Sequence, residues 1–324
     1  MRVAIVLDLL RDINIKKDTS LALAYAAKQK GCEVYLIEDN QVFFKEGEVQ
    51  ASAQRIESID ARVQGLVLGS KVELKDYLRL SARETLRADD LDIVLMRKDP
   101  PLDKGFWGLT YLLQFWEVAG VLVANSTRVL REYNEKCAIL RFPDLIADTS
   151  VTANTRVIET FVRKHGSAII KPLSAMGGEG IIKVHADDAD LKEQVLQSTH
   201  QGKYPVMAQQ VLDIHREGDK RILIFHGQPL PYALCRRPAA GQFKANIAAG
   251  GSGEVVELTE RDRELAAAIV KKLPIDEMGL IGLDVIDGHI TEINLTSPTC
   301  LREIQQHAGE NYAIGYIDGL LSRF

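Results

Sequence analysis

The sequence predicts an α/β protein whose first third is a mostly parallel sheet. Residues 3–7 (VAIVL) are a continuous apolar run, as expected of a strand that is buried on both faces. A helical pattern follows, with N-cap candidates at Asp18, Thr19 and Ser20 and an end at Gly31. Strands and helices continue to alternate after it. This alternation is typical of a parallel sheet with helices on both faces.

The first third continues with strands expected at 34–37, 92–96 and 121–124 and a helix over 106–119. Between about 41 and 71 the pattern is irregular, and we interpret it as hairpins or an insertion. Ligands of parallel sheets bind beyond the carboxyl ends of the strands. Two polar loops occupy such places: RDINIKKDTS after the first strand, and RKDPP after the strand that ends at residue 96.

A second region begins near Asn125, and strands return from Tyr204 onward in VMAQQVL, RILIF and LPYALC. A long loop of small residues, 238–253, follows them, and a loop of that length in a compact enzyme is usually functional. The other elements expected after residue 125 are helices over 127–141, 156–165, 191–198 and 260–272, strands over 168–171 and 181–184, a hairpin around Asp287-Gly288, and a terminal helix.

Composition excludes several classes of protein. The 324 residues include 46% hydrophobic and 26% charged residues, the balance of an ordinary globular protein. The net charge of −5 argues against bulk nucleic-acid binding, and no apolar run approaches the ~20 residues of a membrane span. The N-terminus is expected to be a buried strand rather than a signal peptide. Four scattered cysteines without a CxxC pair are typical of a reducing cytoplasm.

A phosphate-binding loop is indicated by Lys171, at the end of a strand, and the glycines Gly177, Gly178 and Gly180. Backbone N–H groups in such a loop can approach an anion closely. For the loop alone, a glycine-rich hairpin beside a surface lysine is the slightly favoured interpretation. The chain contains neither a GxxxxGK[ST] nor a GxGxxG motif, so the P-loop and nicotinamide-dinucleotide classes lack their main support.

A metal site is indicated by Asp284, Glu292 and Asn294, whose oxygen atoms suit Mg²⁺. Glu292 and Asn294 are two apart on a strand and share a face. A two-residue turn would pair Asp284 with Thr291 and leave Glu292 on the other face. The metal hypothesis therefore predicts a three-residue turn or a bulge. The alternative is that these are solvent-facing polar positions.

Four cations, Lys136, Lys171, Arg221 and Arg236, lie beside predicted strand or loop ends in a chain that is acidic overall. Each taken singly is most simply a solvated surface residue. Together with a phosphate loop and a carboxylate cluster, they are typical of a clamp for a transferred phosphoryl group. No GxSxG motif occurs, so acyl-enzyme chemistry has no candidate nucleophile.

These residues resemble the ATP-grasp superfamily and, within it, the bacterial glutathione synthetase family. The resemblance covers nearly the whole chain and rests on INIKKD, VLMRKDPP, NEK, KPLSAMGGEGI, GDKRIL, NIAAGG, GLDVI and TEINLTSPTC. It implies an N-terminal substrate domain over 1–124, a lid lobe over 125–204, and a C-terminal lobe over 205–324 with a mobile loop at 237–253. The sequence departs from the family pattern at Lys244-Ala245 in that loop, where Arg-Gly is expected.

The resemblance also implies an activity and a role for each residue. The expected reaction is ATP-dependent ligation of glycine to γ-glutamylcysteine through an acyl phosphate. The implied roles are ATP-phosphate contacts for Lys136 and Lys171, a phosphate cover for Gly177, Gly178 and Gly180, an adenine pocket at Gln209, Gln210, Val211 and Leu212, a ribose contact for Asp219, Mg²⁺ (or Mn²⁺) ligation by Asp284, Glu292 and Asn294, stabilisation of the transferred group by Arg221 and Arg236, and substrate contacts for Arg97, Ser297 and Thr299.

The expected setting is a cytoplasmic homotetramer that acts on small molecules, without nucleic-acid or membrane partners. Two alternatives stay open at this stage. One is another ATP-grasp ligase, such as a D-alanine–D-alanine ligase or a ligase that adds amino acids to a protein tail, although RKDPP and SPTC argue against it. The other is an ATP-binding regulatory protein such as the synapsins, which would bind ATP without turning it over.

Overall fold

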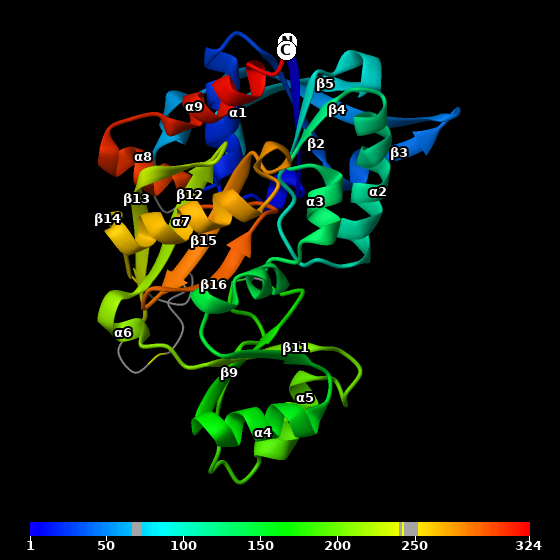
Figure 1. Ribbon diagram of the computed structural model, residues 1–324. Coiled ribbons are helices and arrows are strands. Elements are labelled where there is room, and N and C mark those ends of the chain that lie inside the picture. The colour runs from blue at the N-terminus through cyan, green and yellow to red at the C-terminus, as the bar shows by residue number, and fades with distance from the viewer. Residues whose placement is uncertain (67–72, 176, 240–241, 243–251) are drawn as a thin grey trace.

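The computed structural model describes residues 1–66, 73–175, 177–239, 242 and 252–324, which form three sheets (Figure 1). The first sheet has seven strands, in the order β3-β4-β2-β1-β6-β7, with β5 paired to β4. Its strands are β1 (Arg2–Leu7), β2 (Glu33–Glu38), β3 (Val42–Lys45), β4 (Glu48–Ile59), β5 (Leu78–Leu86), β6 (Ile93–Met96) and β7 (Leu122–Ala124).

The parallel part of this sheet is built as the sequence predicts. Strands β2, β1, β6 and β7 run parallel, and the irregular region adds the antiparallel hairpin of β3 and β4. Helix α1 (Thr19–Gln29) begins at its N-cap Asp18, whose side chain accepts a hydrogen bond from the main chain of Leu21. Helix α2 (Lys104–Val118) packs Phe106 and Trp116 into a second apolar core. Strand β2 pairs with one side of β1 and β6 with the other, so the strand order reverses between β1 and β6. The carboxyl ends of these two strands therefore form a topological switch point.

A smaller antiparallel sheet, named here the lid sheet, lies at one end of the molecule (Figure 1). Helices α4 (Thr155–His165) and α5 (Leu191–Ser198) close its own apolar core with Ile158, Phe161 and Val195. Its last strand lies beyond residue 204, where the sequence analysis ended the second region. The strands of this sheet, in the order β10-β9-β11-β8, are β8 (Thr149–Thr152), β9 (Ser167–Pro172), β10 (Ile182–His185) and β11 (Val206–Gln210).

The third sheet is antiparallel and has the order β14-β13-β12-β15-β16, with α7 packed through Leu265 and Ile269 into its core. Helices α8 and α9 leave this sheet and pack beside α1, so that Leu21 and Ile317 share one apolar core (Figure 1). The elements are α6 (Ile214–Glu217), β12 (Asp219–Phe225), β13 (Gln228–Arg237), β14 (Ser252–Glu257), α7 (Glu260–Lys272), β15 (Leu280–Ile286), β16 (His289–Asn294), α8 (Leu301–Ala308) and α9 (Tyr312–Leu321).

Two expectations differ from the structure. The helix expected over 127–141 is broken into α3 (Thr127–Glu132) and a 3-10 turn, Cys137–Arg141, because the side chain of Asn134 accepts hydrogen bonds from the main chain of Lys136 and Cys137. The loop expected over 238–253 ends in a strand, β14, that was not predicted. Most of that loop, with Lys244-Ala245, lies outside the described residues. Among the described helices, none has the length and apolar character needed to cross a membrane.

Candidate active site

The predicted carboxylates lie on the hairpin of β15 and β16. Its turn has two residues, both with positive φ, which alone would pair Asp284 with Thr291. The ladder instead shifts by one residue, so that Asp284 lies opposite Glu292 and Gly282 opposite Asn294. The bulge that the sequence analysis required is confirmed. It places the side chains of Asp284, Glu292 and Asn294 on one face of the hairpin.

Two arginines hold the carboxylate of Asp284. Arg221, opposite it on β12, donates through Nε to Oδ1 and through Nη2 to Oδ2, the latter at 2.9 Å. Nη2 of Arg236 lies 3.0 Å from Oδ2 of Asp284 and 2.8 Å from Oδ1 of Asp219. Burial by itself raises the pKa of Asp284, but the two guanidinium groups outweigh it and hold that pKa well below its usual value. The carboxylate of Asp284 is therefore ionised at neutral pH.

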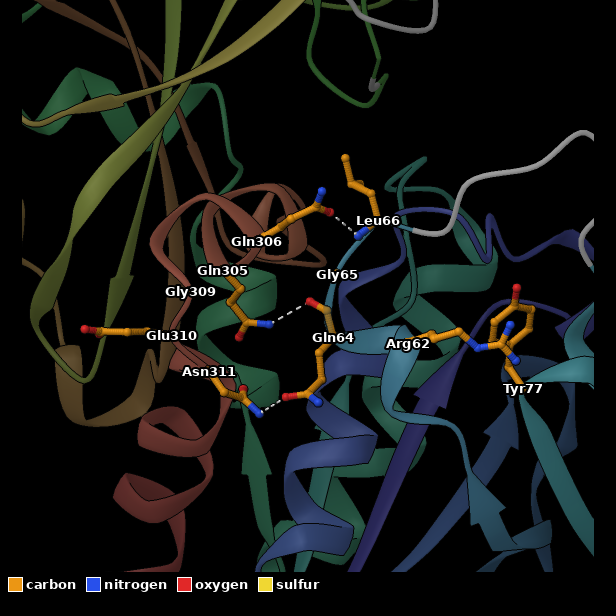
Figure 2. A pocket seen from close by; sticks show the side chains of 10 residues that line it. All are labelled: Arg62, Gln64, Gly65, Leu66, Tyr77, Gln305, Gln306, Gly309, Glu310 and Asn311. Atoms are coloured by element: carbon orange, nitrogen blue, oxygen red, sulfur yellow. Dashed lines mark hydrogen bonds between the residues drawn. The ribbon is translucent and has the colours of Figure 1, made fainter.

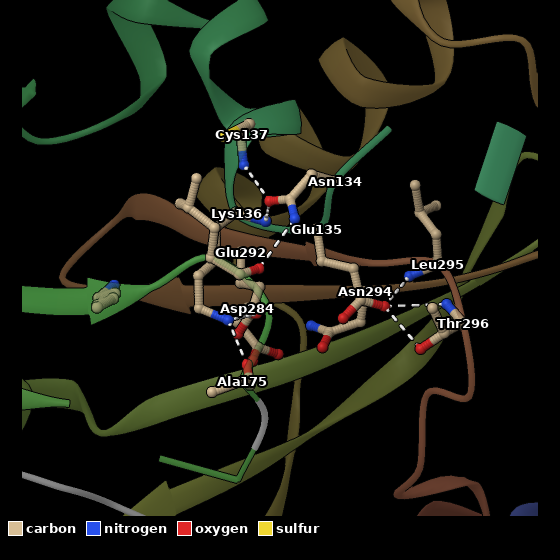
Figure 3. A network of polar contacts seen from close by, with 12 residues as sticks. Asn134, Glu135, Lys136, Cys137, Ala175, Asp284, Glu292, Asn294, Leu295 and Thr296 are labelled. Carbon is tan, nitrogen blue, oxygen red and sulfur yellow. Dashed lines mark hydrogen bonds and ion pairs between the residues drawn. The ribbon is translucent and has the colours of Figure 1, made fainter. Parts of the chain in front are cut away.

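The segment Asn134–Glu135–Lys136 crosses the end of β16 (Figure 3). Nζ of Lys136 donates to Oε1 of Glu292 at 2.9 Å and to the carbonyl of Ala175 at 2.7 Å. Nδ2 of Asn134 donates to the carbonyl of Leu173 at 2.9 Å. The segment thus joins the hairpin to the residues that lead into the predicted glycine loop.

Lys171 lies at the end of β9, where its Nζ donates to Oε1 of Gln209 on β11 at 2.8 Å. Burial lowers the pKa of Lys171, and the carboxylates of Glu292, Asp219 and Asp284 oppose that effect. This ammonium group is partly buried and bonds a neutral amide, so its charge is available to a bound anion. The predicted phosphate lysines, Lys136 and Lys171, thus both lie near Glu292.

The glycine loop that follows Lys171 has left-handed backbone at Gly177, Gly178 and Gly180. A Cβ atom on Gly180 would also lie 2.8 Å from Cγ of Pro172. Other residues are therefore strained at these positions, which explains the composition of the loop. Met176 lies outside the described residues.

Arg97, predicted to contact substrate, is buried at the topological switch point, directly after β6. Its Nε donates to Oγ of Ser20 and its Nη2 to the carbonyl of Pro298 at 3.0 Å, whereas Nη1 has no hydrogen-bond partner in the described part of the chain. Ser297 bonds to the carboxylate of Asp99. Burial raises the pKa of Asp99, against the effect of Ser297 and Arg97. A cation and a carboxylate therefore stand side by side where parallel sheets bind ligands.

The remaining predicted residues lie near these groups. Gln209 lies within β11, and its side chain is buried. Its amide oxygen accepts a hydrogen bond from Nζ of Lys171, and its amide nitrogen donates to Oγ1 of Thr149. Gln210, Val211 and Leu212 continue from this strand into the connection to α6. Asp219 is part of the arginine cluster. Thr299 precedes Cys300, with 3.8 Å between its Oγ1 and the cysteine Sγ.

The donor set of the hairpin suits a hard divalent cation. Within the described residues, no group of three or more His, Cys, Asp and Glu side chains could hold a metal, so the set depends on an amide as well. Asn294 donates through Nδ2 to the carbonyl of Gly282 at 3.2 Å, which leaves its oxygen as the ligand atom. Mg²⁺ binds one or two carboxylates together with substrate phosphates, and Asp284, Glu292 and Asn294 fit that pattern.

Two residues of the site were not predicted from the sequence. Glu135 accepts hydrogen bonds from Leu295 and Thr296, and Asn125 donates to the carbonyls of Leu280 and Leu295 at 2.8 and 2.6 Å. Burial, with Glu292 nearby, raises the pKa of Glu135. Their partners lie more than 150 positions away in the sequence, so no local pattern could have indicated these contacts.

A pocket of about 570 Å³ is lined by none of the predicted site residues (Figure 2). Gln305 donates to the carbonyl of Gln64 at 2.9 Å, Gln306 accepts from the main chain of Leu66 at 2.8 Å, and Asn311 donates to the side chain of Gln64. These amides bond to one another and to backbone. They hold α8 and α9 against the first part of the chain.

The chain matches two family models that together span most of its length. The model described as "Prokaryotic glutathione synthetase, N-terminal domain" matches residues 1–131, and "Prokaryotic glutathione synthetase, ATP-grasp domain" matches residues 135–309. A glutathione synthetase of Yersinia pestis is 39% identical over 305 residues, covering 94% of this chain and 92% of the relative. One of Pseudomonas syringae pv. tomato is 38% identical over 321 residues, covering 99% and 95%.

Solved structures with low sequence identity share the fold. The D-cycloserine synthetase DcsG has a TM-score of 0.65 and 12% identity, covering 100% of this chain and 99% of its own. The ATP-grasp ligase PsnB, complexed with minimal precursor, Mg and ADP, has a TM-score of 0.59 and 16% identity, covering 99% and 97%. The described chain is therefore an ATP-grasp fold.

Proposed function

Because the chain belongs to the prokaryotic glutathione synthetase family, we propose how its residues divide the work of that reaction. The enzyme is an ATP-dependent ligase that joins glycine to γ-glutamylcysteine. The observation that carries the assignment of the site is the cluster of Arg221 and Arg236 around Asp284, beside Glu292 and Lys136.

The reaction has two steps. An oxygen of the cysteinyl carboxylate attacks the γ-phosphorus of ATP, and ADP leaves, which gives an acyl phosphate. The amine of glycine then attacks the acyl carbon, loses a proton, and phosphate leaves as the amide bond forms. No protein nucleophile is needed, so positioning and cationic stabilisation supply the catalysis. Arg221 and Arg236 stabilise the transferred phosphoryl group and the anion of the tetrahedral intermediate.

Nucleotide binding is assigned to the face between the lid sheet and the third sheet. Lys136 and Lys171 contact the ATP phosphates, and Gly177, Gly178 and Gly180 cover them. The end of β11 and the connection that follows it, Gln209, Gln210, Val211 and Leu212, form the adenine pocket through their backbone, and Asp219 contacts the ribose. This assignment is supported by the bond of Lys171 to the neutral amide of Gln209 and by the salt bridge between Lys136 and Glu292.

Asp284, Glu292 and Asn294 are proposed to hold Mg²⁺, with Mn²⁺ as the alternative ion. A divalent ion bound there would neutralise charge on the transferred phosphate. Glu292 is oriented for this role by Lys136, and Asn294 by its own bond to the carbonyl of Gly282. Arg221 holds Asp284 ionised and fixed in direction.

The γ-glutamyl end of the substrate is assigned to Arg97, Asp99, Ser297 and Thr299. Its α-carboxylate suits the guanidinium of Arg97, whose Nη1 has no partner among the described residues. Its α-ammonium suits Asp99, which Ser297 orients. Pro298 lies between this group and the catalytic arginines. A Cβ atom added to Gly282 would be 2.7 Å from Cβ of Pro298 and 3.1 Å from Cδ of Arg221.

The cellular location, the domain boundaries and the oligomeric state of the enzyme are proposals. The unpaired cysteines Cys32, Cys137, Cys235 and Cys300 support a cytoplasmic location. The division at 124 and near 205 stays a prediction, with β11 paired into the lid sheet. A homotetramer, and closure of a loop over 237–253, are predictions from the resemblance alone.

The assignment is tested by measuring ADP release with Mg²⁺, ATP, γ-glutamylcysteine and glycine, omitting each in turn. We expect turnover that requires all four, with glutathione as the product. Arg221→Lys and Arg236→Lys should each lower kcat by roughly 100-fold, the scale of losing one donor to a developing charge. ATP binding without turnover in the wild type would overturn the assignment.

A further inference from the structure

The strand that carries the proposed metal ligands is an edge strand. β16 is last in the order β14-β13-β12-β15-β16, so alternate N–H groups along it point away from β15. One of these, the N–H of Ile293, donates to the main-chain carbonyl of Glu135 at 2.9 Å. At Ile293 the outer edge of β16 is thus paired with Glu135, which lies in the segment between α3 and the 3-10 turn Cys137–Arg141.

The side chain of the same residue closes the next positions. Oε1 of Glu135 accepts from the N–H of Leu295 at 2.8 Å, and from the N–H and Oγ1 of Thr296, both at 2.9 Å (Figure 3). Glu135 is 6% exposed, so these bonds are shielded from water. Asn294 therefore lies between two residues, Ile293 and Leu295, that one glutamate holds.

We propose that Glu135 is a positioning residue for two of the metal ligands, fixing Asn294 and, through the adjoining Lys136, Glu292. The inference rests on the proposed metal site. Lys136 bonds Glu292 while Glu135 bonds the residues on both sides of Asn294, so two consecutive residues hold two of the three proposed ligands. Side chains that orient metal ligands in this way typically contribute 10–100-fold to metal affinity.

A purely structural role for Glu135 would lower stability without changing metal affinity. The test therefore measures Mn²⁺ binding at saturating ADP, from the EPR signal of the free ion, with a protein-free titration to correct for Mn²⁺·ADP. We expect Glu135→Ala to raise the Mn²⁺ dissociation constant by roughly tenfold or more. Glu135→Gln keeps an acceptor oxygen and should raise it by less than about threefold.

Glu117 provides a matched control, because it also accepts from the N–H and Oγ1 of one threonine, Thr127, at the start of α3. Glu117→Ala should lower the melting temperature and leave the Mn²⁺ dissociation constant unchanged. Equal loss of affinity in Glu135→Ala and Glu117→Ala would overturn the proposal, as would an affinity for Glu135→Ala within twofold of wild type.

Three further outcomes also test the role of Glu135. Should Glu135→Ala fail to fold, Thr296→Val removes only one of the three bonds, and we expect it to raise the dissociation constant by roughly threefold. An unchanged value there would overturn the proposal, and so would Glu135→Gln as weak as Glu135→Ala, because charge alone would then explain the loss. Wild type that binds no Mn²⁺ would instead refute the metal site itself.

Discussion

The ammonium group of Lys136 lies 2.9 Å from the carboxylate of Glu292, with the lysine side chain 5% exposed and that of the glutamate 24% exposed. A cation is thus held against a carboxylate at the place where the site is proposed to bind ATP and a metal ion. A buried ion pair that loses one partner leaves the other charge unpaired. Glu292 therefore contributes both as a ligand and as the counter-charge of a phosphate lysine.

Glu292→Gln should lower kcat by at least roughly 100-fold, because the amide provides neither the charge for the metal nor that for Lys136. The fold should persist, since Lys136 keeps its bond to the carbonyl of Ala175 at 2.7 Å. Steady-state ADP release and thermal melting check both statements. An unchanged rate would remove Glu292 from the metal site.

Gly282→Ala should impair catalysis through crowding. The added Cβ would lie 2.7 Å from Cβ of Pro298, 3.1 Å from Cδ of Arg221 and 3.3 Å from Cβ of Asn294. One of these groups must move, and displacement of catalytic groups by about 1 Å can cost roughly 100-fold in rate. We expect kcat to fall more than tenfold while the ATP dissociation constant changes little. Wild-type kcat in this variant would show that the neighbours adapt without cost.

Arg97→Lys should weaken the binding of γ-glutamylcysteine and leave the binding of ATP nearly unchanged. An ammonium group cannot reproduce the planar fork of Arg97, so recognition of the γ-glutamyl carboxylate weakens. We expect the KM for γ-glutamylcysteine to rise about tenfold or more, the cost of one charged hydrogen bond, while the KM for ATP stays within a factor of about two. A cysteine dipeptide whose N-terminal part lacks the α-carboxylate should bind wild type and variant equally. An unchanged KM for γ-glutamylcysteine would argue that Arg97 only holds Ser20 and Pro298.

The sequence was sufficient where structure depends on local pattern. The parallel strands follow from their apolar runs, and the bulge at Asp284 and Glu292 followed from requiring three ligands on one face. It was insufficient at residues 133–136, because the polar NEK segment has a helix-compatible pattern. Its break depends on Asn134 reaching Leu173, and Glu135 reaching β16, neither of which is visible locally. The strand β14 was missed because small residues precede it.

Stability should fall at acidic pH because of His226. Burial lowers the pKa of His226 below its ordinary 6.5, against the effect of its bond to the carbonyl of Tyr316, and Arg323 adds to the lowering. The unfolded chain therefore takes up a proton below about pH 6.5 that the folded chain resists, and stability declines by at most about 1.4 kcal/mol per pH unit there. His226→Asn, tolerated at the positive φ of this turn, should flatten the fall in melting temperature between pH 7 and 5.5. Parallel curves for the two proteins would contradict the assignment.

Two glycines of α9 should respond to alanine in opposite directions. A Cβ on Gly319 would lie 2.2 Å from Cδ2 of His226, whereas nothing lies within 4 Å of a Cβ on Gly315. Gly319→Ala is therefore expected to destabilise by roughly 1–3 kcal/mol through overpacking, and Gly315→Ala to stabilise by up to about 1 kcal/mol through helix propensity. Because the clash is with the side chain of His226, adding His226→Asn should recover part of the stability lost in Gly319→Ala, whereas its effect should simply add to that of Gly315→Ala. Urea unfolding of the wild type, the three single variants and the two double variants measures these free energies, and strictly additive effects would show that His226 does not determine the glycine.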